Sequence, residues 1–106
     1  VFSPGLHGST PDFADLPALF EEYGVDLVLT GHDHLYAVTK PQNGLRYVVT
    51  GGGGASLYPC VPAYFSEVCE VRHHFLFVEA TQRRIRVWAV GTAGAPFDRF
   101  TTRGLD

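Results

Sequence analysis

The chain has 106 residues, of which 45% are hydrophobic and 18% are charged, so composition predicts one folded domain, 1–106, and excludes a disordered chain. Its 8 basic and 11 acidic residues give a formal net charge of -3, which argues against a nucleic-acid partner held by bulk positive charge. No apolar run approaches the ~18 residues of a membrane span, so no membrane partner is expected either.

The first part of the chain predicts a loop, a helix and a buried strand. Residues 1–14 are rich in Ser, Gly, Pro and Thr, as loops are. A helix capped by Asp15 is expected next, because apolar side chains recur at helical spacing up to a stop at Gly24. Residues 25–30 are mostly apolar, which is typical of a strand buried on both faces, and they end abruptly at a Gly-His-Asp-His sequence.

A turn and a short strand are predicted in the middle of the chain. Residues 41–44 contain an Asn-Gly pair, which favours a tight turn, and a strand over 47–50 follows. Four glycines, 51–54, end this strand; they either let the chain pass close beneath a site or form a flexible turn. A nucleotide-binding P-loop is excluded, because no Lys and Ser/Thr follow in the required order. Residues 55–71 are expected to be irregular.

Two more strands, over 73–80 and 85–90, are predicted to form a hairpin, and apolar and polar residues alternate clearly in the second. From residue 91 onward the chain is expected to be turn-rich. A solvated strand face explains the basic cluster of the hairpin without a nucleic-acid partner; the cluster comprises Arg83, Arg84 and Arg86. The predicted fold class is therefore α/β, with a mixed sheet, one main helix and a C-terminal β-hairpin.

The two cysteines, Cys60 and Cys69, lie in the segment expected to be irregular. No other Cys or nearby pair of His completes a four-ligand zinc pattern. A disulfide between them would remove roughly 2.5 kcal/mol of unfolded-chain entropy and would indicate an oxidising compartment. Two independent buried thiols are an equal alternative on sequence alone.

The strongest chemical signal is Gly31-His32-Asp33-His34, at the carboxyl end of a predicted buried strand. Ligands of open α/β sheets gather at that end, and neutral imidazoles bind zinc, iron and manganese well. We therefore interpret His32 and His34 as metal ligands. Asp33 would orient these two ligands without binding the metal itself. Gly31 would allow the backbone to approach closely. The alternative is a solvated loop that holds two histidines.

Residues 22–34, which include this motif, resemble the last signature block of the calcineurin-like metallophosphoesterases, most closely the purple acid phosphatase branch. Residues 46–55 are similar to the strand and glycine turn of that family, and residues 74–87 to its closing hairpin. The resemblance implies an α/β sandwich in which the motif gives one histidine to each ion of a two-metal centre. By position, His32 would bind one metal and His34 the other.

The resemblance also implies an activity and its cofactors. Enzymes of that family hydrolyse phosphate monoesters or diesters with two divalent or trivalent metal ions, here iron, zinc or manganese. Tyr36 stands where the branch often has an aromatic residue, so it is expected near the pocket. The substrate partner would be a phosphate ester, and the cysteines and family habit favour a secreted or periplasmic protein.

The earlier metal motifs of the family are absent from the chain. Residues 2–9 resemble the loop that follows the fourth motif, so the chain is expected to be the C-terminal part of such an enzyme, weak or inactive alone. His7 in this loop is interpreted as a catalytic proton donor or phosphate contact; the alternatives are a replacement ligand or an exposed loop histidine. His73 and His74 point to opposite faces of a strand and are expected to be structural.

A second hypothesis is a non-catalytic metal-binding or assembly module derived from the same fold. Strands that normally pack against a missing N-terminal half would expose edges and apolar faces. Such a chain would form a homo-oligomer or bind a partner chain.

Overall fold

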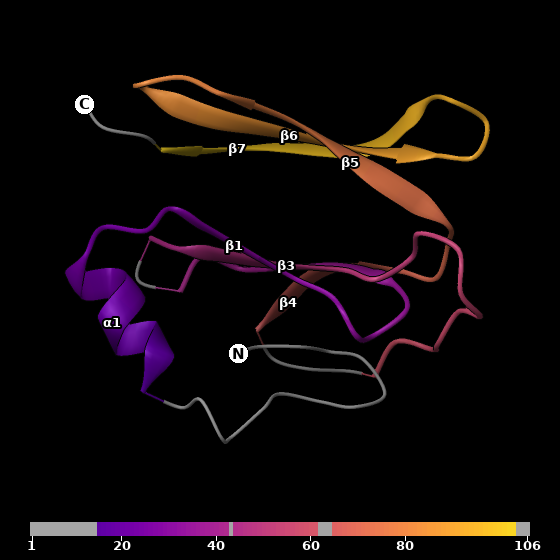
Figure 1. Cartoon of the computed structure of the whole chain (residues 1–106), viewed down its shortest axis with the longest axis horizontal. Helices are drawn as coiled ribbons and strands as arrows, with labels where there is room; N and C mark the ends of the chain where they lie inside the picture. Colours follow the sequence, from indigo (N-terminus) through magenta and orange to yellow (C-terminus); the bar gives the residue numbers. More distant parts are fainter. Residues whose placement is uncertain (1–14, 43, 62–64, 104–106) are drawn as a thin grey trace.

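The computed structural model describes residues 15–42, 44–61 and 65–103; in them two β-sheets lie one above the other, with a helix beside the first sheet (Figure 1). The elements, in chain order, are α1 (Leu16–Glu22), β1 (Leu27–Thr30), β2 (Tyr36–Thr39), β3 (Arg46–Thr50), β4 (Ser66–Glu70), β5 (His74–Ala80), β6 (Arg84–Gly91) and β7 (Pro96–Arg103). The expected combination of a mixed sheet with one helix is present, but strands dominate the described residues and the helix is short.

The helix α1 forms where its apolar spacing predicts it. Asp15 stands at the N-cap position, but its side chain makes no capping hydrogen bond, contrary to expectation. Gly24 follows the helix with a left-handed φ of 69°, as expected of a helix stop. α1 contacts the first sheet through Phe20, whose ring centroid lies 6.5 Å from that of Tyr47, whereas Tyr23 is 76% exposed. The helix therefore packs on the sheet along one narrow side.

The first sheet has the strand order β1-β3-β2-β4, with β1 parallel to β3 and the other neighbours antiparallel. Its central strands, β2 and β3, are buried on both faces. The strand expected over residues 25–30 is present as β1, but its expected burial on both faces is wrong, since β1 lies at the sheet edge with Leu29 48% exposed. An apolar run does not reveal its place in a sheet, because the neighbouring strands come from elsewhere in the chain.

Three strands, β2, β4 and β7, lie in segments for which no strand is predicted. β4 falls within residues 55–71 and β7 within the tail after residue 91, and both contain charged residues that make their pattern resemble a loop. Pairing decides their conformation, because β4 pairs with β2 and β7 pairs along nearly all of β6. The predicted C-terminal hairpin is thus part of a three-stranded antiparallel sheet, β5-β6-β7.

The core lies between the two sheets and is built from alternate residues of the facing strands. Tyr36 and Val38 of β2, Val48 of β3 and Ala89 of β6 form one buried cluster, each at most 1% exposed. The alternation predicted for residues 85–90 is confirmed, since Ala89 points into this core while the arginines of β6 do not. The burial of apolar surface between the two sheets holds them together.

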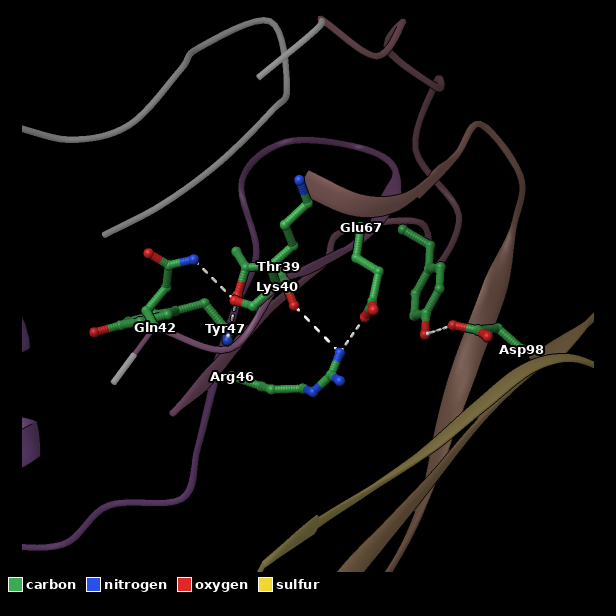
Figure 2. A network of polar contacts seen from close by, with 8 residues as sticks. Thr39, Lys40, Gln42, Arg46, Tyr47, Glu67 and Asp98 are labelled. Carbon is green, nitrogen blue, oxygen red and sulfur yellow. Dashed lines mark hydrogen bonds and ion pairs between the residues drawn. The ribbon is translucent and has the colours of Figure 1, made fainter. Parts of the chain in front are cut away.

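Arg46 adds polar links across the first sheet. Its guanidinium, on β3, donates a hydrogen bond to the carbonyl oxygen of Thr39 on β2 at 3.3 Å and forms an ion pair with Glu67 on β4 (Figure 2). The same guanidinium carbon lies 5.5 Å from the ring centroid of Phe100 on β7. One side chain therefore connects three neighbouring strands to the second sheet.

A buried hydrogen bond also crosses between the sheets. The hydroxyl of Tyr36 donates to a carboxylate oxygen of Asp98 on β7 at 2.6 Å (Figure 2, in which Asp98 carries the label). Burial, and then this bond to Asp98, raise the pKa of Tyr36 well above the 10.0 of an exposed tyrosine. The contact favours the protonated hydroxyl, so the stability it contributes is fully present below pH 10.0 and is lost as the pH rises above that value.

The substitution Tyr36→Phe is expected to lower the free energy of unfolding by about 2 kcal/mol, because it leaves the Asp98 carboxylate without the hydroxyl that it binds. The variant should also lose part of the decline in stability that the natural chain shows above pH 10.0. Urea denaturation at neutral and alkaline pH measures both effects. Tyr23→Phe, at a side chain that is 76% exposed, is the matched control and should change stability by less than about 0.5 kcal/mol. Equal stability of the two variants would contradict this account of the sheet interface.

Candidate metal centre

The Gly-His-Asp-His sequence forms the turn that carries the chain from β1 into β2. Gly31 and His32 are exposed, Asp33 is buried at 2% exposure, and His34 is half-buried. His32 has a φ of 76°, the one left-handed residue other than glycine among the described residues. A side chain costs energy in that conformation, and such residues concentrate where a site requires a particular backbone geometry.

His34 is held in one orientation by the loop that follows β3. Its Nδ1 lies 2.7 Å from the carbonyl oxygen of Ser56, and since a carbonyl only accepts, Nδ1 carries the proton and donates it. The imidazole also stacks on Tyr58, with ring centroids 4.2 Å apart and planes 20° from parallel. The backbone N–H of Tyr58 donates to the His34 carbonyl at 2.9 Å. In the neutral form of the ring, this hydrogen bond leaves the lone pair on Nε2, as in metal-binding histidines.

The first two glycines after β3 are required by close packing. A Cβ at Gly51 would lie 2.1 Å from the carbonyl oxygen of Asp33, and a Cβ at Gly52 would lie 2.6 Å from Nδ1 of His74. Gly53 and Gly54 have no atom within 4 Å of such a Cβ. Gly51 therefore permits a close approach to the turn and Gly52 a close approach to His74, whereas Gly53 and Gly54 lie in open space.

A disulfide joins Cys60 to Cys69, which decides between the two alternatives left open by the sequence. It links the loop that carries Ser56 and Tyr58 to β4. Both cysteines pack against the outer cluster of the first sheet, formed by Leu35, Ala37 and Val49. The support of His34 is thus tied to the sheet by a covalent bond.

The other candidate residues lie apart from this turn or outside the described residues. Tyr36 points into the core between the sheets, and its contacts give it a structural role. His74 is buried at 7% exposure, with Nδ1 donating to the carbonyl oxygen of Arg72 at 3.0 Å and Nε2 in a hydrogen bond with the Thr50 hydroxyl at 2.9 Å. Both of its ring nitrogens are used, which agrees with the structural role expected of it. His7 lies outside the described residues.

Ser56 and Tyr58 are the site residues that sequence reasoning missed. They stand 22 and 24 positions after His34 in a segment that carries no motif, so only the fold brings them to it. In 15–42, 44–61 and 65–103, no three His, Cys, Asp or Glu side chains gather closely enough to hold a metal ion. The motif itself offers two imidazoles, fewer than the three protein ligands of a catalytic zinc site.

Comparison of the sequence with protein-family models and with curated proteins gave no match. A search of solved structures matched "GAP50 the anchor in the inner membrane complex of Plasmodium", with a TM-score of 0.88 and 19% sequence identity. The alignment covers 100% of this chain and 34% of the GAP50 chain, so this chain spans about a third of that protein. This likeness shows a shared fold. Within the described residues, no helix is both long and apolar enough to cross a membrane.

Proposed function

We propose that this chain carries the two-histidine part of a metal-dependent phosphoesterase centre in a metallophosphoesterase-like α/β sandwich, with His32 and His34 as ligands. The observation that supports the proposal is the state of His34. Its Nδ1 proton is bound by a backbone carbonyl and its ring is stacked, so the ring is oriented and its Nε2 is the nitrogen that would bind a metal. A histidine without a ligand role on a solvated loop would not need both the hydrogen bond to Ser56 and the stacking on Tyr58.

The remaining residues of the turn fit a metal site in distinct ways. The left-handed backbone at His32 turns the chain sharply just before the second histidine. The close packing of Gly51 beneath Asp33 holds the turn at the end of the sheet. When bound, the metal ions of such a centre supply Lewis acidity toward phosphoryl oxygens and activate water at neutral pH. This chain would contribute ligands and their orientation, and further ligands would come from residues outside those described.

A second candidate is a metal-binding or assembly module without phosphoesterase activity. Two observations favour it: the described residues offer no three-ligand cluster, and the matching solved structure bears the name of an anchor. Both proposals predict weak metal binding by the 106-residue chain, and they differ in whether phosphate esters are hydrolysed once the remaining ligands are supplied. A secreted or periplasmic location belongs to either proposal, because a disulfide persists in an oxidising compartment.

Calorimetric titration with zinc or manganese tests the assignment of His34. We expect weak binding that falls about tenfold in His34→Ala, because the chain then loses one of two ligands. Tyr58→Leu should cause a smaller loss by releasing the ring. The matched control is His73→Ala, whose Nδ1 lies 3.3 Å from the carbonyl oxygen of Gly52 and which should bind metal like the natural chain. Equal affinity of the His34 and His73 variants would refute the proposed site.

Hydrolysis of an aryl phosphate by the isolated chain tests whether the proposed centre is only partial. The 106-residue chain alone is expected to show little or no turnover, since two imidazoles make an open site. Robust turnover that His32→Ala abolishes would show that this chain holds a complete centre and would overturn the assignment of a partial one.

A further inference from the structure

The second sheet has one face that the first sheet does not cover. Figure 1 shows β5, β6 and β7 as the outer layer, with the first sheet on one side of them. Leu76, Ala89 and Phe100 point inward to the core. Because side chains alternate along a strand, the neighbouring residues point outward. We call this side the outer face. Its aromatic and arginine side chains include Phe75, Phe77, Arg84, Arg86, Trp88 and Arg99.

Strand register gathers arginines on this face. Arg84, Arg86 and Trp88 are alternate residues of β6, and Arg99 of β7 stands directly opposite Trp88. These four side chains line a hollow of about 400 Å³, and Trp88 and Arg99 also line a second hollow of about 460 Å³. The strand face expected to be solvated therefore contains a hollow. Arg84 and Arg86 line it together with Arg99 of β7.

An aromatic row borders the arginines. Phe77 stands opposite Trp88 in the β5–β6 register, and their ring centroids are 5.6 Å apart. Phe75 and Phe77 are 58% and 56% exposed, although they lie in a regular strand. Exposed aromatic rings beside guanidinium groups are typical of protein interfaces rather than of solvated surface.

The charge of the outer face is opposite to that of the whole chain. Among the described side chains, three arginines stand with two carboxylates: Glu79, whose oxygen lies 3.8 Å from Arg86, and Asp98, which lines the second hollow with Arg99 and accepts from the Tyr36 hydroxyl. Among the described residues, no carboxylate lies within ion-pair distance of Arg84 or Arg99. A face with this positive excess, on a chain with a net charge of -3, complements an acidic partner. Guanidinium groups bind carboxylates through paired hydrogen bonds.

We propose that the outer face docks an extended acidic peptide segment of a partner protein. Its carboxylates would engage Arg84, Arg86 and Arg99, and its apolar side chains would pack on Phe77 and Trp88. An extended segment suits two adjoining hollows that lie along the surface, whereas a small ligand needs enclosure. A nucleic acid is disfavoured because polyanion binding depends on many phosphate contacts, whereas the side chains described on this face include three arginines.

The natural chain has a built-in probe, since Trp88 is its single tryptophan. Titration with a short synthetic peptide of alternating Glu and Leu is expected to shift the emission of Trp88. A peptide with Lys in place of Glu should give no shift, and added salt should weaken binding. The double variant Arg86→Gln with Arg99→Gln should bind the acidic peptide about tenfold more weakly. The matched control is Arg83→Gln in the β5–β6 turn, which lines neither hollow and should bind within about twofold of the natural chain.

The proposal fails if the acidic peptide does not bind, or if the double variant binds it as tightly as the natural chain. It also fails if oligothymidylate or vesicles of phosphatidylserine bind more tightly than the peptide, since the face would then serve another class of partner. All substituted side chains are outside the core, so circular dichroism should show natural folding in each variant.

Discussion

Replacing Gly51 with alanine is expected to destabilise the protein by about 3 kcal/mol, near the upper end for an overpacked site. The new Cβ would lie 2.1 Å from the carbonyl oxygen of Asp33 and 2.9 Å from its carbonyl carbon. Both are backbone atoms, so no side-chain rotation can relieve the overlap. The turn must move relative to β3, and the hydrogen bond from the Gly51 N–H to the Leu35 carbonyl, 3.1 Å long, must stretch or break. Denaturant unfolding measures the change in stability.

The matched control is Gly53→Ala, two residues further along the same loop. No atom lies within 4 Å of a Cβ at Gly53, so stability should change by less than about 0.5 kcal/mol. Neither glycine has a left-handed φ, so the comparison isolates steric space from backbone conformation. Equal losses in the two variants would show that the glycines matter for backbone freedom and not for the approach to the turn. Gly51→Ala should also weaken metal binding, because it displaces Asp33, the residue between His32 and His34.

Reduction of the Cys60–Cys69 disulfide is expected to lower the free energy of unfolding by about 2.5 kcal/mol. The bond closes a short loop in the unfolded chain, and its loss gives that chain more conformations. Reduction should also loosen the segment that contains Ser56 and Tyr58, because its covalent link to β4 is gone. Denaturation with and without dithiothreitol measures the first effect. The NMR signal of the His34 Nδ1 proton, bound to the Ser56 carbonyl at 2.7 Å, reports the second through faster exchange with water.

The variant with both Cys60→Ala and Cys69→Ala is the control for this experiment. It should be as unstable as the reduced protein, and dithiothreitol should have no further effect on it. The Nδ1 proton of His74 should be less affected in either case, because its acceptor, the carbonyl of Arg72, does not belong to the segment that contains Ser56 and Tyr58. If reduction changed the signals of both histidines equally, the disulfide would act on the whole fold and not on the loop beside His34.

Parts of the fold could be predicted from local pattern alone. Helix α1 and strands β3, β5 and β6 follow from helical spacing, strand alternation and glycine stops. The place of β1 at a sheet edge and the existence of β2, β4 and β7 could not be predicted. These depend on which strands become neighbours, and the partners that satisfy their backbone hydrogen bonds lie far away in the sequence. The predicted sandwich of the phosphoesterase family stays a proposal.

For the candidate site, the sequence by itself determined the donor types: two histidines with one residue between them, following a glycine after a strand. The tertiary structure decided how those donors are presented. The carbonyl of Ser56 selects the tautomer of His34, Tyr58 holds its ring, and the disulfide anchors both. It likewise turned Tyr36 into the core and brought Arg99 beside Trp88. The physical reason is the same throughout: residue type fixes what a side chain can bind, whereas contacts between distant segments fix its direction and its neighbours.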